Sequence, residues 1–187
     1  MPLNVPNVLT WARIIMIPLF VGIFYLPDSW LSPSTRNITA TALFIVAALT
    51  DWLDGYLART LNQMSAFGEF LDPVADKLMV AAALVVLVDL SRTHAIFAFI
   101  IIGREITISA LREWMAKIGR SRSVAVSLLG KLKTVSQMVA IPMLLYQHTI
   151  GPLDMEFIGN ILMMIAAVLT VVSMMYYLKL AMPHLRE

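Results

Sequence analysis

Six apolar segments follow one another along the chain, and each is long enough to cross a lipid bilayer as a helix. They cover approximately residues 8–26, 38–58, 74–90, 95–115, 126–148 and 157–180. A membrane-spanning helix needs about 20 consecutive, mostly apolar residues. The connections between the segments are short and carry Pro, Ser, Asn and Gly. The pattern predicts an all-α, polytopic membrane protein with six transmembrane helices.

The composition supports a membrane location and a single domain. Of the 187 residues, 59% are hydrophobic and only 14% are charged, and the mean hydropathy is +0.80. Soluble domains carry about 25% charged residues. No stretch has the character of a soluble domain, a linker or a repeat, so we expect one membrane domain over residues 1–187. The chain has no cysteine, which excludes disulfides and thiolate metal sites, and its net charge of +2 gives no indication of a nucleic-acid partner.

The distribution of lysine and arginine predicts the orientation in the membrane, because these residues concentrate in cytoplasmic loops. Arg36 and Arg92 belong to the first and third loops. The others belong to the N-terminus, the second and fourth loops and the C-terminus: Arg13, Arg59, Lys77, Arg104, Arg112, Lys117, Arg120, Arg122, Lys131, Lys133, Lys179 and Arg186. Both termini are therefore expected in the cytoplasm, on the same face as the second and fourth loops.

The segment from Thr50 to Leu78, TDWLDGYLARTLNQMSAFGEFLDPVADKL, places acidic residues where apolar helices should run. Asp51 and Asp54 are spaced i, i+3, and Asp72 and Asp76 are spaced i, i+4, so each pair occupies one face of a helix. Two antiparallel helices joined by a short loop can turn these faces toward each other. An aspartate in the middle of a membrane helix costs roughly 2.5–3.5 kcal/mol, and four converging carboxylates also repel one another. We therefore expect positive charge between them.

Carboxylate oxygens without histidine or cysteine favour a hard divalent cation such as Mg²⁺, Mn²⁺ or Ca²⁺. Four carboxylates shared between two helices can hold two ions, and paired metals are a known device of phosphoryl chemistry. The small residues Gly55, Ala58 and Gly68 lie on the same faces and leave room for a diphosphate, while Arg59 can pair with a phosphate oxygen. Close helix packing also explains the small residues, and a cytoplasmic anchor also explains Arg59.

Two features near this segment leave alternatives open. Pro73 either kinks the third helix or starts it, with Asp72 as the N-cap. At the start of the first helix, residues 7–10 can lie near a nucleotide, but Asn7 and Thr10 are equally well explained as a helix cap or as ordinary polar interface residues.

The spacing of the acidic segment resembles the signature of the CDP-alcohol phosphotransferase family. The chain carries DWLDGYLAR, then eight residues, then GEFLDPVAD, which matches every fixed position of that signature. The resemblance implies that Asp51, Asp54 and Asp72 bind one divalent metal ion and that Asp51, Asp72 and Asp76 bind a second, either Mg²⁺ or Mn²⁺. It implies that Asp76 is the general base for the acceptor alcohol. It also implies that the CDP moiety is lined by Gly55, Ala58, Arg59 and Gly68.

A set of cations further along the chain bears on the acceptor. Arg104 and Arg112 are spaced i, i+8 in GREITISALREW, and GKLKT supplies Lys131 and Lys133 at the start of the fifth segment. These four can gather near the cytoplasmic surface, where they would suit an acceptor that carries a phosphate. Alternatively they are anchors or lipid contacts, or Arg112 and Lys131 simply balance the two acids Glu105 and Glu113. For Lys117, Arg120 and Arg122, the anchor explanation is favoured.

Over almost its whole length the chain is similar to the bacterial branch of this family that uses glycerol 3-phosphate. The likeness extends from NVPNVLTWARI at the N-terminus to GKLKTVSQM. It implies transfer of a phosphatidyl group from CDP-diacylglycerol to sn-glycerol 3-phosphate by direct attack, with release of CMP. It further implies a homodimer in the bacterial cytoplasmic membrane, among membrane lipids, with its active site facing the cytoplasm.

Other functions remain possible on the sequence alone. Within the family, the acceptor could be serine, inositol phosphate or a second phospholipid, although the cationic set disfavours an acceptor with an amine. Intramembrane prenyl transfer also uses aspartate-bound Mg²⁺, but it needs an aspartate spacing that the chain lacks. A cation transporter is less consistent, because the chain has no internal repeat and its acids lie near one surface.

Overall fold

The computed structural model describes residues 5–60, 66–119 and 128–182. In these ranges the chain forms six helices and one small hairpin. The helices are α1 (Val5–Ile23), α2 (Pro33–Thr60), α3 (Ala66–Asp89), α4 (Ala95–Lys117), α5 (Leu128–Tyr146) and α6 (Met155–Ala181). The predicted all-α class is confirmed, and each predicted segment corresponds to one helix.

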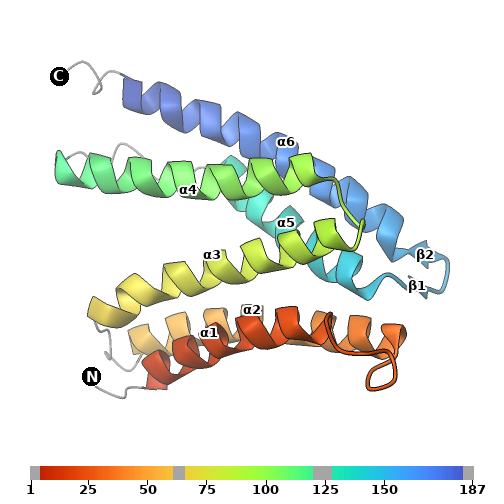
Figure 1. The fold of residues 1–187 in the computed structure, drawn as a ribbon. Coiled ribbons are helices and arrows are strands. Elements are labelled where there is room, and N and C mark those ends of the chain that lie inside the picture. Colours follow the sequence, from red (N-terminus) through yellow and green to blue (C-terminus); the bar gives the residue numbers. More distant parts are fainter. Residues whose placement is uncertain (1–4, 61–65, 120–127, 183–187) are drawn as a thin grey trace.

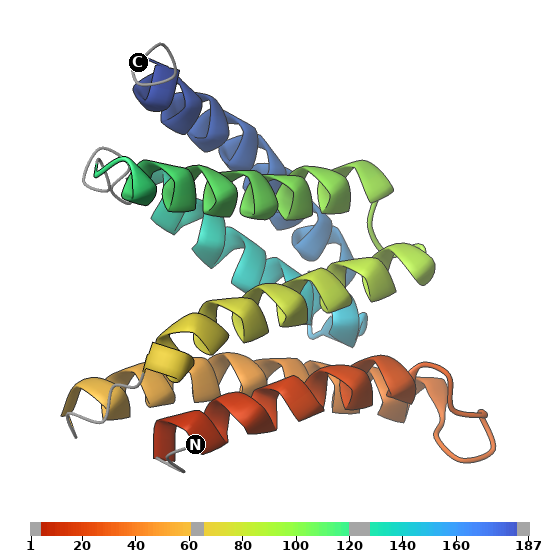
Figure 2. The ribbon, with the colours of Figure 1, turned by 60° about the vertical axis from the view of Figure 1, so that its left-hand side comes forward.

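The helices form a layered bundle (Figures 1 and 2). In both views α1 and α2 lie side by side, and α3 crosses next to them and separates them from α4. Helices α5 and α6 share the most extensive contact in the described chain, and α6 also packs against α4. The start of α1 and the end of α6 lie at the same end of the bundle, which is the arrangement that an even number of alternating helices produces.

Local sequence explains where several helices begin. Helix α2 starts at Pro33, because proline suits the first helical position, and the Ser32 hydroxyl accepts a hydrogen bond from the Thr35 backbone N–H at 3.2 Å. The hairpin of β1 (Thr149–Ile150) and β2 (Leu153–Asp154) leads directly into α6. Asp154 then caps α6, since its side chain accepts from the Phe157 backbone N–H at 3.0 Å.

Pro73 lies inside α3 and not at its start. The helix begins at Ala66, eight residues before the apolar segment predicted from residue 74. The prediction counts only residues that suit a membrane, so it leaves out the polar residues before Pro73. Such residues can still belong to a helix. Pro73 lacks the N–H that would have bonded the Glu69 carbonyl, and α3 continues past it. Asp72 and Asp76 are therefore one turn apart on a continuous helix, and Asp72 is not an N-cap.

The core is apolar and closely packed. Its buried side chains come from all six helices and include Phe20, Phe44, Leu84, Leu87, Ile101, Ile141, Leu144 and Met163. Gly159 lets α6 approach α5 closely, because a Cβ atom at this position would lie 2.9 Å from Cγ of Leu144. Small residues at such crossings are typical of helix packing in membranes.

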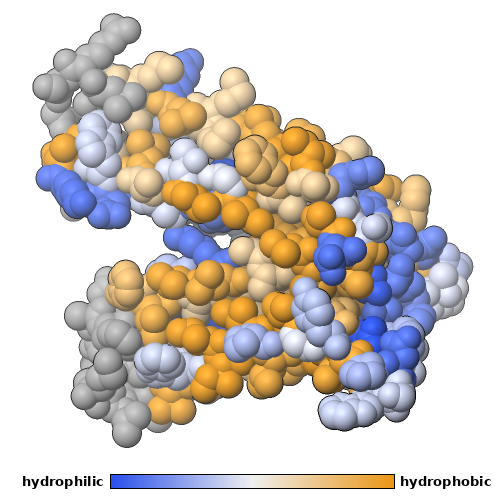
Figure 3. All heavy atoms as spheres, in the orientation of Figure 1, coloured by the Kyte–Doolittle hydropathy of each residue, from blue (hydrophilic) through white to orange (hydrophobic). Residues whose placement is uncertain are grey.

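The outer surface is also apolar over much of its area. Figure 3 shows a broad hydrophobic belt across the middle of the bundle, with hydrophilic atoms gathered towards one end. Large apolar side chains that are more than half exposed include Leu19, Phe70, Phe99 and Phe157. Among the described helices, α6 alone is long and apolar enough to cross a membrane by length and composition, and Val8–Ile23 forms a shorter apolar helix. Helices α3 and α4 differ from α6 in composition, because they contain charged residues along their length.

Candidate active site

The acidic residues of α2 and α3 are held by polar side chains of α1. Nη1 of Arg13 donates to Oδ1 of Asp51 at 2.6 Å. The Thr10 hydroxyl donates to Oδ1 of Asp72. Arg13 is 1% exposed and Thr10 is completely buried, so both contacts are made from inside the bundle. Helix α1 therefore faces the predicted metal site with one cation and one hydroxyl.

These two residues of α1 were not identified from the sequence. The sequence predicts Arg13 only as one of the cytoplasmic cations, and it allows two explanations for Thr10. A signal was present, because Thr10 and Arg13 are spaced i, i+3 and share one helix face. An arginine placed well inside an apolar segment also requires a partner. The identity of that partner depends on which helix packs against α1.

The predicted metal ligands are only partly described by the structure. Asp51, Asp72 and Asp76 have described side chains, and Gly68 is buried in α3. The side chains of four other predicted site residues lie outside the described part, although their backbone belongs to α2: Asp54, Gly55, Ala58 and Arg59. Among the described side chains, no three of Asp, Glu, His or Cys lie close enough together to hold a metal ion. The donor set, which consists of carboxylates on facing helices, nevertheless has the chemistry that fits a hard divalent cation.

A cavity of about 240 Å³ opens beside Asp76. Figure 3 shows hydrophilic atoms at the base of a hollow between α3 and α4. Its polar and charged lining comes from α3, α4, α5 and α6: Asp76, Lys77, Arg104, Glu105, Arg112, Lys133, Thr134, Gln137 and Tyr177. We call this space the acceptor cavity. It brings three of the four predicted phosphate-binding cations together with the predicted base.

Lys131 is the predicted cation that is not part of this lining. It is exposed on α5, whereas Lys133, two residues later, is 1% exposed. Positions two residues apart point to different sides of a helix, so α5 directs only one of the two lysines inward. The part of Lys131 in acceptor binding stays a prediction.

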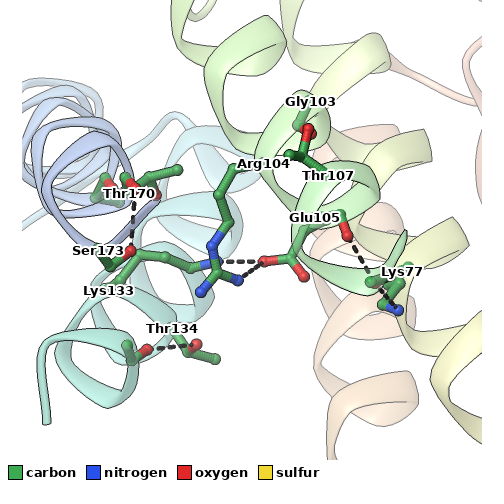
Figure 4. Close-up of polar contacts among 12 residues, drawn as sticks. Lys77, Gly103, Arg104, Glu105, Thr107, Lys133, Thr134, Thr170 and Ser173 are labelled. Carbon is green, nitrogen blue, oxygen red and sulfur yellow. Dashed lines mark hydrogen bonds and ion pairs between the residues drawn. The ribbon is translucent and has the colours of Figure 1, made fainter. Parts of the chain in front are cut away.

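Within the acceptor cavity, Glu105 joins two of the cations (Figure 4). Its Oε1 accepts from Nη1 of Arg104 at 2.9 Å and also from Nζ of Lys133. The guanidinium groups of Arg104 and Arg112 lie over the Tyr177 ring, at 5.8 and 5.9 Å from its centroid. Such cation–π contacts hold two arginines near each other in spite of their like charge.

The ion pairs differ from those considered from the sequence. Glu105 pairs with Arg104 and Lys133, and Glu113 pairs with Lys117 at 2.8 Å. Within the described chain, neither Arg112 nor Lys131 forms an ion pair. The alternative in which these two cations balance Glu105 and Glu113 is therefore wrong. The reason is that Lys117 lies one helical turn from Glu113, and α5 presents Lys133 to Glu105.

Aspartates of α2 and α3 that bond to α1, next to a cavity lined by arginine and lysine, suit an enzyme that acts on phosphate esters. The chain belongs to the CDP-alcohol phosphatidyltransferase family, whose profile matches residues 3–172.

Similar proteins include the enzyme of Escherichia coli (strain K12) named CDP-diacylglycerol–glycerol-3-phosphate 3-phosphatidyltransferase. Enzymes of the same name from Shigella flexneri serotype 5b and Shigella boydii serotype 4 are equally similar. Each is 50% identical to the chain over 183 residues, which cover 97% of this chain and 96% of the relative.

Proposed function

We propose that this protein transfers the phosphatidyl group of CDP-diacylglycerol to sn-glycerol 3-phosphate and releases CMP. The names of its bacterial relatives, 50% identical over nearly full length, support both substrates. The observation that carries the proposal is the acceptor cavity, which joins Asp76 to Arg104, Arg112 and Lys133. A phosphate bound by these cations would bring the rest of a small acceptor alcohol close to the carboxylate.

The family generally depends on divalent metal ions. We assign Asp51, Asp54 and Asp72 to one Mg²⁺ or Mn²⁺ ion and Asp51, Asp72 and Asp76 to a second. When bound, these ions neutralise the diphosphate and stabilise the charge that develops on the leaving CMP. Arg13 and Thr10 orient two of the carboxylates from α1, which supports this assignment.

The nucleotide would lie along the small residues of α2 and α3. We assign Gly55, Ala58 and Gly68 to the surface that the CDP moiety contacts, because side chains of this size let a diphosphate approach the helices. Arg59 would bind a phosphate oxygen.

Asp76 is the base of the proposed reaction. It takes the proton from the C1 hydroxyl of glycerol 3-phosphate as that oxygen attacks the phosphorus that bears diacylglycerol. A bond forms between the C1 oxygen and this phosphorus, and the bond from the same phosphorus to the bridging oxygen breaks, so CMP leaves. No covalent enzyme intermediate is needed. Arg104, Arg112 and Lys133 hold the acceptor's phosphate during this step.

The cationic lining favours one further candidate acceptor within the family. Inositol phosphate carries the same phosphate group, so the cavity's charge alone does not separate it from glycerol 3-phosphate. The ammonium groups of serine and other amine-bearing alcohols would be repelled by the cations. Competition between acceptors is therefore part of the test.

We also propose that the six helices cross the bacterial cytoplasmic membrane with both termini and the active site at the cytoplasmic face, as a homodimer. The apolar belt in Figure 3 supports a membrane location. The position of both termini at one end of the bundle supports an even number of crossings. The loop between α3 and α4, which contains Arg92, lies at the other end, as the orientation requires (Figure 1).

The test is CMP release by the purified protein in detergent, with CDP-diacylglycerol and each candidate acceptor, in Mg²⁺, Mn²⁺ or EDTA. We expect release that requires both metal and glycerol 3-phosphate. Asp76→Asn should abolish it, whereas Asp89→Asn, an exposed aspartate at the far end of α3, should not change it. Metal-dependent release with serine but not with glycerol 3-phosphate would refute the proposed acceptor.

A further inference from the structure

The acceptor cavity contains an anion of its own. The Glu105 side chain is 26% exposed and makes ion pairs with the side chains of Arg104 and Lys133, which are 8% and 2% exposed. Buried cations need a counter-charge whenever no ligand is bound, because an unpaired buried charge is strongly destabilising. Glu105 supplies that charge in the structure described here.

The carboxylate occupies the point where the two cations converge. A single oxygen, Oε1 of Glu105, accepts from both Nη1 of Arg104 and Nζ of Lys133 (Figure 4). An oxygen of a bound phosphate would take this same position, since hydrogen bonds from both cations meet there. Glu105 and an acceptor phosphate therefore cannot both occupy it.

The same cavity holds donors that Glu105 leaves unused. Nε of Arg104 is buried and has no hydrogen-bond partner. Arg112 also lines the cavity and forms no ion pair within the described chain, although its guanidinium lies over Tyr177. An arginine binds a phosphate most strongly through two parallel N–H donors. A phosphate, which has three free oxygens, can satisfy these donors as well as those that Glu105 engages.

We propose that Glu105 is a built-in competitor of the acceptor's phosphate group and thereby determines the affinity and selectivity of the acceptor site. This inference rests on the proposed function, in which the acceptor carries a phosphate. In the free enzyme Glu105 neutralises Arg104 and Lys133. A phosphate displaces it by using the additional donors of Arg104 and Arg112, whereas a smaller or singly charged anion gains too little to do so.

A further cation on the wall of the same cavity is available to the displaced carboxylate. Lys77 lines the same cavity, and its Nζ donates to Oγ of Ser109 at 2.5 Å, one turn along α4 from Glu105. The Ser109 hydroxyl also donates to the Glu105 carbonyl at 2.6 Å, so Ser109 connects Lys77 to the turn of α4 that carries Glu105.

A purely supporting role for Glu105 predicts the opposite result. If the carboxylate served to position Arg104 and Lys133 for the phosphate, its removal would weaken acceptor binding. If it competes with the phosphate, its removal strengthens binding. Glu105→Gln keeps the size of the side chain and removes its charge, so the sign of the change separates the two roles.

The experiment measures binding of inorganic phosphate and of glycerol 3-phosphate to the purified full-length protein by calorimetry, together with the KM for glycerol 3-phosphate. We expect Glu105→Gln to lower both dissociation constants and the KM by roughly tenfold, which corresponds to about 1.4 kcal/mol. Inhibition by sulfate should become stronger. Glu113→Gln is the matched control, because Glu113 is 70% exposed and its ion-pair partner in the described part of the chain is Lys117, on the outer face of α4.

Glu105→Asp keeps the experiment decisive if the glutamine variant does not fold. Aspartate preserves the charge, but its shorter side chain holds the two cations less well, so phosphate binding should again tighten, by a smaller factor. Suppose that the wild type releases CMP with glycerol 3-phosphate but the folded variants bind phosphate no more tightly. This result would overturn the proposed role of Glu105 and leave the proposed function intact. A wild type that releases no CMP with glycerol 3-phosphate would overturn the proposed function and this inference with it.

Discussion

At the scale of single residues, the candidate site depends on how buried charges are paired. Arg13 pairs with Asp51 across α1 and α2, and Glu105 pairs with two cations across α4 and α5. In an apolar interior each such group is costly alone and stable only with its partner. The pairs therefore fix side-chain positions within the site as well as neutralising charge.

Arg13 provides a test of this idea. Arg13→Ala should lower the free energy of unfolding by about 2 kcal/mol, because Asp51 loses a charge-assisted hydrogen bond. It should also slow CMP release by roughly tenfold or more, since Asp51 is no longer held in one orientation. Thermal unfolding in detergent, initial rates and the affinity for Mn²⁺ measure these effects.

The controls for Arg13 are one conservative and one distant variant. Arg13→Lys keeps the charge but not the planar guanidinium, so it should recover part of the activity. Arg36→Ala removes an arginine that pairs with the exposed Asp28 in the first loop, and it should leave the rate of CMP release unchanged. Full activity and unaltered Mn²⁺ affinity in Arg13→Ala would show that Asp51 does not need this partner.

At the scale of helices, a small residue permits one close crossing, between α5 and α6. Gly159 of α6 lies against Leu144 and Met143 of α5. A Cβ atom added to Gly159 would lie only 2.9 to 3.3 Å from their side-chain atoms. A Cβ atom added to Gly103 of α4 would have no neighbouring atom within 4 Å. Two glycines in two helices therefore have different physical roles, although the sequence gives no means of separating them.

These two glycines make a matched pair of variants. Gly159→Ala should destabilise the protein by about 1–3 kcal/mol, because the added methyl group forces α5 and α6 apart. Gly103→Ala should be neutral or stabilising by up to about 1 kcal/mol, because alanine favours the helix. Thermal unfolding of both variants measures the difference. A similar shift of both midpoints would contradict the close contact at Gly159.

At the scale of the whole molecule, the apolar belt and the alternating helices define two ends. One end holds both termini of the described chain, and the other holds the first and third loops and the hairpin (Figure 1). In the proposed orientation the first end faces the cytoplasm. The acceptor cavity and the aspartates then lie towards the side on which CDP-diacylglycerol presents its nucleotide.

Accessibility of introduced cysteines tests this orientation, and the natural absence of cysteine gives a clean background. Trp30→Cys lies in the first loop at an exposed position, and Lys117→Cys lies at the exposed end of α4. In intact cells, a membrane-impermeant maleimide should label the first variant and not the second. After the membrane is opened, both should react. Labelling of Lys117→Cys in intact cells would reverse the proposed orientation.

The sequence by itself determined the helical class, the number of helices and the rows of acidic residues. These features depend on local patterns: apolar runs of about twenty residues, and spacings of three or four that share one helix face. The fixed spacing of the aspartates also indicated the family. Helix bounds were less exact, as α3 shows, because a count of apolar residues finds the part of a helix that suits a membrane and not the whole helix.

Only the tertiary structure decided which side chains meet. Thr10 and Asp72 are separated by 62 residues, Arg13 and Asp51 by 38, and Glu105 and Lys133 by 28. The sequence presented Glu105 as one acid among several cations and offered Arg112 or Lys131 as partners for it. The rotation of α5 about its axis selected Lys133, and the packing of α1 brought Arg13 to Asp51. Such pairings follow from how whole helices cross, because each crossing is set by the summed packing of many apolar side chains and not by any one of the residues that it brings together.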